Sequence, residues 1–323
     1  MAQDPRALLQ KAEKTLASAG SGFSFFGGRE DKYQNAADLF TQAANAFKMQ
    51  NQGMATPSSC LRTPPSPNSK DPELTHTLWK KQTGVEAGKA FEQAAQVQTS
   101  KLNELDDAAN SFVDAFKAYR KDAPSDAVRC LKIAVDRYCV KGNFRRAASH
   151  NETMAEVYET QLDDVNAALE CYETAASWYE GDNAMALANK LWLKVAEAAA
   201  IAGDYHKAVE NFEKVAEQSV QNQLMKYSVK DYLLKAGICH LASGDMVATR
   251  RALEKYVVLD PSFASQREYM LLSDLCEALE QQSQDVFTDK LFQYDQICKL
   301  DNWKTTILVR VKNTIEQASD DFA

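Results

Sequence analysis

The chain has 323 residues, of which 45% are hydrophobic and 25% are charged, a composition typical of a globular protein that can bury a large core. Its formal net charge of −8 and sequence pI near 5.2 argue against nucleic acid as the main partner, because phosphate binding needs a basic surface or a dense basic stripe. Only 12 glycines are present, which disfavours a sheet-rich fold with many tight turns and makes helix the expected structure.

The sequence also bears on the compartment. The amino-terminal stretch contains acidic residues and no apolar core of signal-peptide length, and no later window approaches the roughly 20 apolar residues of a membrane span. The seven cysteines are odd in number and widely spaced, which is typical of reduced, buried thiols. We therefore expect a cytoplasmic protein that is at most peripheral on membranes.

The first predicted helix, residues 5–19, is followed by a loop, GSGFSFFGG at 20–28. Phe23, Phe25 and Phe26 lie in this loop, where they either cap the end of the core or remain available for an apolar surface. Three phenylalanines at about 1.5–3 kcal/mol each would contribute roughly 5–9 kcal/mol on insertion, before the cost of ordering the loop. The magnitude suits reversible membrane contact, but the residues alone leave both alternatives open.

A pattern of small and large apolar residues recurs from Ala36 onward. Positions +4, +7, +8 and +11 from this alanine are apolar and lie on one face of a helix. Positions +4, +7 and +8 are apolar again from starts at Ala87, Ala108, Ala127, Ala168, Ala208 and Thr249. The starts at 87, 127, 168, 208 and 249 lie 40, 41, 40 and 41 residues apart. We predict an all-α fold in which helical hairpins of about 40 residues stack into a right-handed, TPR-like α-solenoid.

Residues 53–80 interrupt the first hairpin and contain five of the eight prolines. This segment is too rich in proline for helix and too poor in aliphatic residues for a core, so we predict a disordered insertion in the hairpin turn. Lengthening a turn from ~4 to ~32 residues costs roughly 2 kcal/mol, which a solenoid can tolerate. Because the flanks join cleanly without it, the segment is hypothesised to be a translated intron, and natural protein with a mass near 35.9 kDa would refute that idea.

From Pro261 onward the repeat spacing fails, and three further helices are expected. They lie in SQREYMLLSDLCEALEQQ, SQDVFTDKLFQYDQICKL and NWKTTILVRVKNTIEQA. The predicted domains are therefore a solenoid over 1–261, which includes the insertion, and a capping carboxy-terminal bundle with an acidic tail over 262–323.

No arrangement of residues indicates catalysis. The four histidines are far apart in sequence, and neither H-E-x-x-H nor C-x-x-C occurs. The glycine-rich loop at 20–28 lacks the Gly-Lys-Ser/Thr of a phosphate loop, and no nucleophile lies in a recognisable elbow. We expect no enzymatic activity, no metal and no cofactor.

Basic residues recur near the ends of the predicted helices, at Arg120, Lys121, Arg145, Arg146, Lys190, Lys194, Lys226 and Lys230. In a solenoid such positions can align along one surface, although any single lysine is more often part of a solvated face.

Three stretches carry a resemblance to a known family, namely KYSVKDYLLKAGICHL at 226–241, FASQRE at 263–268, and the LDxWxxTIL pattern from Leu300 to Leu308. Together with the hairpin array and the FSFFGG loop, they resemble the soluble NSF attachment proteins, alpha-SNAP in particular. The resemblance covers nearly the whole chain except 53–80, and the charge pattern suits a fungal member.

The resemblance implies an adaptor for vesicle fusion. Several copies would wrap a SNARE complex, a four-helix bundle of syntaxin-like, synaptobrevin-like and SNAP-25-like helices, and recruit and stimulate NSF, the hexameric AAA+ ATPase that unwinds it. SNARE bundles are long, rigid and acidic, so a basic concave face could bind them by charge and shape.

Family contacts to the bundle carry over to Lys190, in ALANKLWLK, and to Arg120, Lys121, Arg146, Lys226, Lys230 and Arg267. One position departs from the family: animal relatives have Lys after FTIAA, whereas this chain has Ser149 after FRRAA. We hypothesise that Arg145 and Arg146 compensate for the missing lysine.

The family's ATPase-stimulating end carries over to Asp320, Asp321 and Phe322. Phe322 replaces the family's penultimate leucine, so the size of the stimulation is open. The resemblance also makes the FSFFGG loop a membrane contact. The alternatives are a TPR-type co-chaperone scaffold that clamps a chaperone's carboxy-terminal peptide, whose repeats would be 34 residues long, and an enzyme with a hidden pocket.

Overall fold

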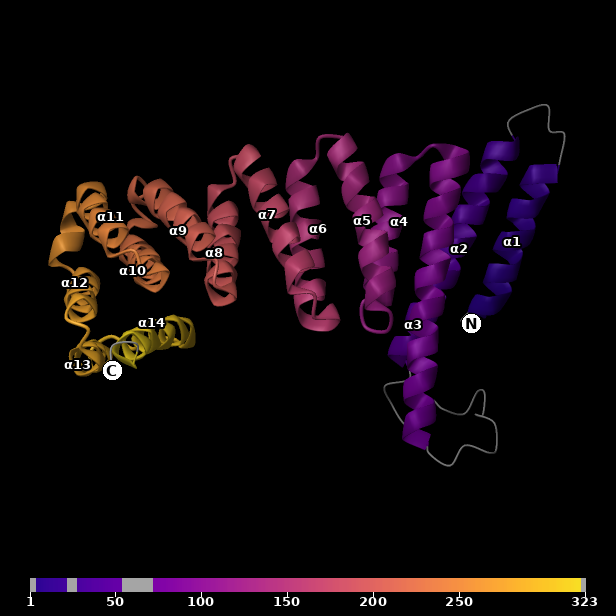
Figure 1. The fold of residues 1–323 in the computed structure, drawn as a ribbon. Coiled ribbons are helices and arrows are strands. Elements are labelled where there is room, and N and C mark those ends of the chain that lie inside the picture. The colour runs from indigo at the N-terminus through magenta and orange to yellow at the C-terminus, as the bar shows by residue number, and fades with distance from the viewer. Residues whose placement is uncertain (1–3, 22–27, 54–71, 321–323) are drawn as a thin grey trace. The chain divides into compact units, whose positions relative to one another are not determined.

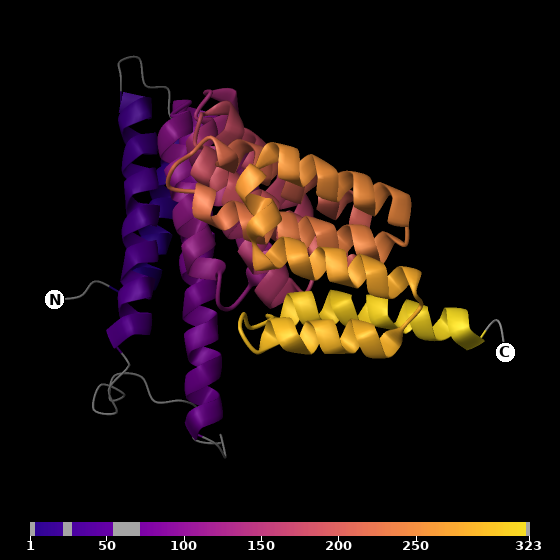
Figure 2. The ribbon, with the colours of Figure 1, turned by 90° about the vertical axis from the view of Figure 1, so that its left-hand side faces the viewer.

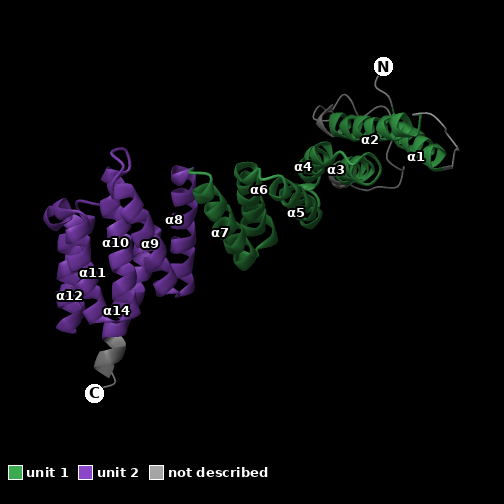
Figure 3. Ribbon diagram, turned by 90° about the horizontal axis from the view of Figure 1, so that it is seen from above, with its two compact units in different colours: residues 1–183 green, residues 184–323 purple. Residues whose placement is uncertain are grey.

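The computed structural model describes residues 4–21, 28–53 and 72–320, and every regular element in these ranges is helical (Figure 1). The predicted all-α class is confirmed. The chain divides into two compact units, residues 1–183 and 184–323 (Figure 3).

In the described residues of the first unit there are seven α-helices and two short π-helical turns. Its elements are α1 (Pro5–Ser21), α2 (Gly28–Gly53), α3 (Pro72–Val97), η2 (Gln98–Leu102), α4 (Leu105–Tyr119), α5 (Pro124–Val140), α6 (Phe144–Val157), η3 (Tyr158–Leu162) and α7 (Val165–Gly181). Each helix packs mainly on the helix before it and the helix after it, as expected for stacked hairpins.

The second unit continues with hairpins and ends in three further helices. Its elements are α8 (Met185–Ala202), α9 (Tyr205–Val220), α10 (Lys226–Ser243), α11 (Met246–Leu259), η4 (Pro261–Ser265), α12 (Arg267–Glu280), α13 (Gln284–Asp295) and α14 (Asn302–Asp320). Figure 2 shows α14, in yellow, side by side with α13. The helix also contacts α10 and α8, which precede it by a long stretch of sequence.

The small residues that set the predicted repeat are buried where helices cross. Every predicted start position, including Ala87 and Thr249, lies in a helix and is at most 2% exposed. Large rings such as Phe40 and Phe212 fill the space beside them. Alanine lets two helices approach closely while an aromatic ring fills the remaining gap, so the period in the sequence is the period of the packing.

Three glycines with a left-handed backbone lie in the turns between helices. Gly142, Gly203 and Gly244 have φ of 76°, 91° and 79°, the left-handed region that residues with a Cβ rarely adopt. They follow the ends of α5, α8 and α10, and the next helix begins within a few residues of each.

The predicted insertion is wrong at its carboxyl end. Residues 72–80 were expected to be disordered, but α3 begins at Pro72. Proline is favoured at the first position of a helix, since its missing N–H has no partner there anyway and its φ is already helical. Residues 54–71 lie outside the described residues.

The three helices expected after Pro261 are present as α12, α13 and α14. Their buried residues, such as Leu272, Phe287 and Leu308, share one core with residues of α8 to α11. All of these helices thus belong to the compact unit that begins at Ala184. The boundary between residues 261 and 262 marks the end of the repeat pattern and stays a prediction.

Candidate binding face

Several helices begin with basic residues, against the preference of the helix dipole. Arg145 and Arg146 lie in the first turn of α6, Lys226 starts α10 and Arg267 starts α12. The first turns of α6, α8 and α10 contain no acidic residue. A helix N-terminus carries partial positive charge, so a cation there forgoes the roughly 0.3–1 kcal/mol that an anion would contribute. These bases do not stabilise the helices that carry them. Their position therefore favours a role in binding an acidic partner.

In the first unit, Arg146 is held in a defined position. Its guanidinium lies 4.8 Å from the centre of the Tyr138 ring, and its Nη2 donates to Oδ1 of Asn110 at 3.2 Å. The Tyr138 hydroxyl donates to the same oxygen, and the His150 ring stacks on Tyr138 at 5.4 Å. Burial, Arg146 and Lys117 together lower the pKa of His150, so the imidazole is neutral near pH 7 and Arg146 supplies the positive charge.

Arg145 is held less firmly than Arg146, by one exposed ion pair. Its Nη1 lies 3.6 Å from Oδ2 of Asp182, and both side chains are more than a third exposed. Exposed ion pairs contribute about 0–1 kcal/mol. An external carboxylate can therefore replace Asp182 at little cost.

Arg120 and Lys121 lie at the other end of the same helices. Arg120 follows α4 and pairs with Glu156 of α6 at 3.7 Å, whereas Arg146 of α6 contacts Asn110 near the start of α4. Both contacts join the same two helices and lie ten residues apart along each of them, roughly 15 Å of helix. The structure thus brings Arg145 and Arg146 together but separates them from Arg120 and Lys121.

In the second unit, the residues predicted to contact the bundle lie in the first two turns of α8, α10 and α12, and Lys194 lies one turn after Lys190 in α8. Lys190 and Lys226 are exposed, as is Arg267. Lys230 pairs with a buried carboxylate, because its Nζ lies 3.0 Å from Oε1 of Glu268, which is only 9% exposed. A buried carboxylate needs a charged or hydrogen-bonding partner, so Lys230 also has a structural role within this unit.

The structure reveals two exposed apolar residues that the sequence analysis missed. Leu224 is 90% exposed and Tyr227 is 85% exposed, on either side of Lys226. Leu224 precedes α10, and Tyr227 lies off the buried face of this helix, which is formed by residues such as Val229 and Leu233. The signal in the sequence was an apolar pair outside the helical period and flanking a lysine. Exposed Tyr at a basic surface is typical of protein interfaces.

Two predicted groups cannot be placed. Phe23, Phe25 and Phe26 lie outside the described residues, between Ser21 at the end of α1 and Gly28 at the start of α2. Asp321 and Phe322 also lie outside them, and Asp320 is the last residue of α14.

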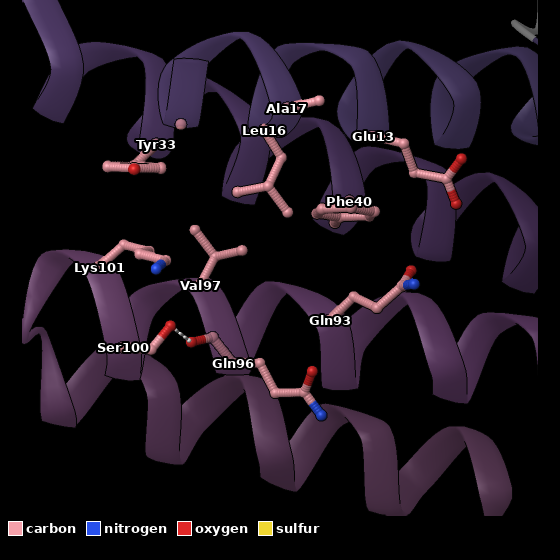
Figure 4. Close-up of a pocket in the computed structure, with 11 residues that line it drawn as sticks. Glu13, Leu16, Ala17, Tyr33, Phe40, Gln93, Gln96, Val97, Ser100 and Lys101 are labelled. Carbon is pink, nitrogen blue, oxygen red and sulfur yellow. Dashed lines mark hydrogen bonds between the residues drawn. The ribbon is translucent and has the colours of Figure 1, made fainter. Parts of the chain in front are cut away.

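A hollow in the first unit is bounded by α1, α2, α3 and η2 (Figure 4). Leu16, Phe40 and Val97 line it, and the Nζ of Lys101 lies 6.0 Å from the centre of the Tyr33 ring beside it. None of the residues that line this hollow pairs a nucleophile with a general base, so it offers no catalytic arrangement.

The described residues offer neither a metal site nor a membrane-spanning helix. In residues 4–21, 28–53 and 72–320, no cluster of three or more His, Cys, Asp or Glu side chains is placed to hold a metal ion. Within the same part of the chain, none of the helices combines the length and the apolar character that a membrane crossing requires.

Comparison with known proteins identifies the family. The family model described as soluble NSF attachment protein, SNAP, matches residues 3–61 and 78–316. The chain belongs to the SNAP family. The stretch that the SNAP model leaves unmatched, 62–77, lies inside the predicted insertion.

Curated SNAP relatives match over almost the whole chain. A probable vesicular-fusion protein sec17 homolog of Neurospora crassa is 52% identical over 323 residues, which cover 100% of both chains. A protein of the same description from Schizosaccharomyces pombe is 47% identical over 322 residues, also 100% of both. The human alpha-soluble NSF attachment protein is 37% identical over 316 residues, 98% of this chain and 96% of the relative.

Likeness to solved structures is weak. The crystal structure of the P58(IPK) TPR domain has a TM-score of 0.24 and 13% identity, with 98% of this chain and 99% of that chain covered. Membership of the SNAP family therefore depends on sequence.

Proposed function

We propose that this protein is the adaptor that binds assembled SNARE four-helix bundles and recruits and stimulates the hexameric AAA+ ATPase NSF for SNARE disassembly in vesicle fusion. Membership of the SNAP family and relatives described as vesicular-fusion proteins support this proposal. The observation that carries it is the presence of bases, without any acidic residue, in the first turns of α6 and α10, where the helix dipole favours acids.

Binding to the bundle is electrostatic in its first step. Arg145 and Arg146 in the first unit, and Lys190, Lys226 and Arg267 in the second, present positive charge that a long acidic rod can meet at several points. Attraction of this kind steers association and weakens as salt rises, because the Debye length is about 10 Å at 0.1 M ionic strength. It reads charge and shape rather than a particular sequence.

Leu224 and Tyr227 add a short-range contribution to the same contact. Both are almost fully exposed beside Lys226, so burying them against the apolar seams between bundle helices would contribute about 1.5–3 kcal/mol each before ordering costs. This part of the binding is independent of salt.

The carboxyl end of α14 serves the ATPase. Asp320, Asp321 and Phe322 offer acidic and aromatic groups to a basic ATPase surface, and ATP hydrolysis takes place on that partner, so the adaptor needs no catalytic residues and no cofactor. Phe23, Phe25 and Phe26 give each copy a weak membrane contact that becomes useful when several copies act together. The protein is then cytoplasmic and peripheral on membranes, without contact to nucleic acid.

The test is binding of recombinant protein to a purified SNARE bundle, followed by ATPase turnover with NSF. We expect bundle binding that weakens with salt and ATPase turnover that rises only when bundle and adaptor are both present. Binding to a chaperone's carboxy-terminal peptide instead of the bundle would replace this function by that of a TPR-type co-chaperone.

A further inference from the structure

A network of alternating charges joins three helices of the second unit. In order, its members are Glu197 of α8, Lys235 and Asp231 of α10, and Lys304 of α14. The Nζ of Lys235 lies 2.7 Å from Oε1 of Glu197 and 3.5 Å from Oδ2 of Asp231. The Nζ of Lys304 then donates to Oδ1 of the same Asp231 at 2.5 Å.

Lys304 is buried, with 8% of its surface exposed. Besides Asp231, its Nζ lies 3.2 Å from Oδ2 of Asp301, and its backbone N–H donates to Oδ1 of Asp301. An ammonium group taken out of water costs several kcal/mol unless it is paired and hydrogen-bonded. The position of Lys304 is therefore determined by these two carboxylates.

Two further bonds attach α14 to the backbone of α8. The indole N–H of Trp303 donates to the carbonyl oxygen of Glu197 at 2.9 Å, and Nη1 of Arg310 donates to that of Ala200 at 3.2 Å. The Trp303 ring also meets the edge or face of Phe212 at 5.5 Å between centres. The two acceptors lie in the last two turns of α8, so these bonds fix α14 to that end of the helix.

The helices that hold α14 are those that carry the proposed bundle-binding lysines. Asp231 follows Lys230 directly in α10, and the two side chains have different partners: Lys230 pairs with Glu268 of α12, and Asp231 with Lys304 of α14. Lys190 lies two turns before Glu197 in α8. The bundle-binding residues and the helix that leads to the ATPase-stimulating end are thus joined by a few named contacts within one unit.

We propose that Lys304 is a positioning residue that, through Asp231, holds α14 in register with α10, so that the carboxyl end of α14 meets the ATPase at a set distance from the bound SNARE bundle. This inference rests on the proposed function. It adds that bundle binding and ATPase stimulation depend on different parts of the second unit, coupled through the pair of Lys304 and Asp231.

The decisive variant is Lys304→Met, which keeps the length of the side chain and removes the charge. We expect the Kd for the SNARE bundle to stay within about twofold. ATPase turnover at saturating, bundle-bound adaptor should fall about fivefold, the low end of typical couplings between sites. Lys304→Arg, which can still reach Asp231, should restore most of the turnover.

Two comparisons separate positioning from a general loss of stability. Asp231→Asn should reproduce the effect, and the double variant should be no worse than either single one, since both remove the same contact. Fluorine NMR of protein containing 5-fluorotryptophan should show a second or broadened Trp303 signal in Lys304→Met, assigned with Trp303→Phe. The matched control is Lys299→Met, which removes an exposed pair with Asp295 just before α14 and should change neither binding nor turnover.

The outcomes are distinguishable. Wild-type protein that neither binds the bundle nor stimulates NSF would refute the proposed function. Functional wild type with an equally active Lys304→Met would overturn the positioning role alone, as would loss of bundle binding and turnover in equal proportion.

Discussion

The two compact units use a half-buried carboxylate in the same way but with different partners. In the first unit, Glu92 of α3 accepts from Arg129 at 2.7 and 3.0 Å and from the Tyr119 hydroxyl. In the second, Glu213 of α9 accepts from Lys255 and Tyr256 of α11 and lies 3.4 Å from Nε2 of His240. Each carboxylate joins its own helix to the next two helices along the chain, which is where a stacked array needs a specific contact.

The two carboxylates differ in the groups that hold them. Arg129 remains protonated under all ordinary conditions and grips Glu92 with both arms of its guanidinium. Glu213 is enclosed to a similar degree and has partners of another kind: burial opposes its charge, but hydrogen bonds from His240, Lys255 and Tyr256 lower its pKa to about 2. The second unit also carries the added helix α14. The comparison suggests that the first unit is a simple stack, whereas the second is built around contacts between distant segments.

The largest expected effect on binding comes from reversing one binding charge in each unit. The double variant Arg146→Glu and Lys190→Glu should weaken bundle binding about 100-fold at low salt, or about 2.7 kcal/mol, because two attractions become repulsions. The loss should shrink as salt rises, which binding measured at several salt concentrations would follow. The single variants show whether the units share the binding. An unchanged Kd for the double variant would remove both residues from the binding face.

The next effect tests the two carboxylates. Glu213→Gln should lower the free energy of unfolding by about 3.5 kcal/mol at pH 7, because about 1.4 kcal/mol corresponds to each unit of pKa shift. Glu92→Gln should change it in the same direction, since the pKa of Glu92 is also lowered. The folded pKa of Glu213, about 2, lies below the ordinary 4.5. Its stabilisation is therefore complete above pH 4.5 and is lost as the pH falls toward 2. Denaturant midpoints of wild type and variant should converge on acidification; a constant gap would contradict this account.

A smaller effect is expected from the exposed apolar pair of the second unit. Leu224→Ser with Tyr227→Ser should weaken bundle binding about tenfold without changing its salt dependence, because the lost contribution is apolar. The melting temperature should be unchanged, since both side chains are exposed. Phe144 of the first unit differs from this pair, because it is only partly exposed and its ring lies 6.4 Å from the Trp178 ring. A changed salt slope for the double variant would show that Lys226 had been disturbed instead.

The smallest effect concerns the loop that only the first unit carries. Phe23, Phe25 and Phe26 changed together to Ser should leave disassembly of soluble SNARE bundles near normal and slow disassembly on liposomes a few-fold, as expected for one weak anchor per copy. Equal rates of the variant and the wild type on both substrates would refute the membrane role.

Most of the helical framework could be predicted from the sequence, because its period is also the period of its packing. Ala87, Ala127 and Ala208 recur at the spacing with which helices cross, and glycine marks the turns at Gly142 and Gly203. The helical start of α3 at Pro72 was missed, since a proline-rich stretch predicts disorder unless one proline falls at the first position of a helix. Leu224 and Tyr227 were missed because the repeat pattern describes buried residues.

The sequence by itself determined the helices, their repeat and the family, since these depend on local spacing that any stacked array preserves. Which charges meet was decided only by the tertiary structure. Nothing local distinguishes Lys304, buried against Asp231, from Lys299, exposed beside Asp295, because burial and partner depend on how α14 packs against helices far earlier in the chain. Contacts of that kind arise when the chain folds back on itself, and their energies follow from the enclosure that the fold creates.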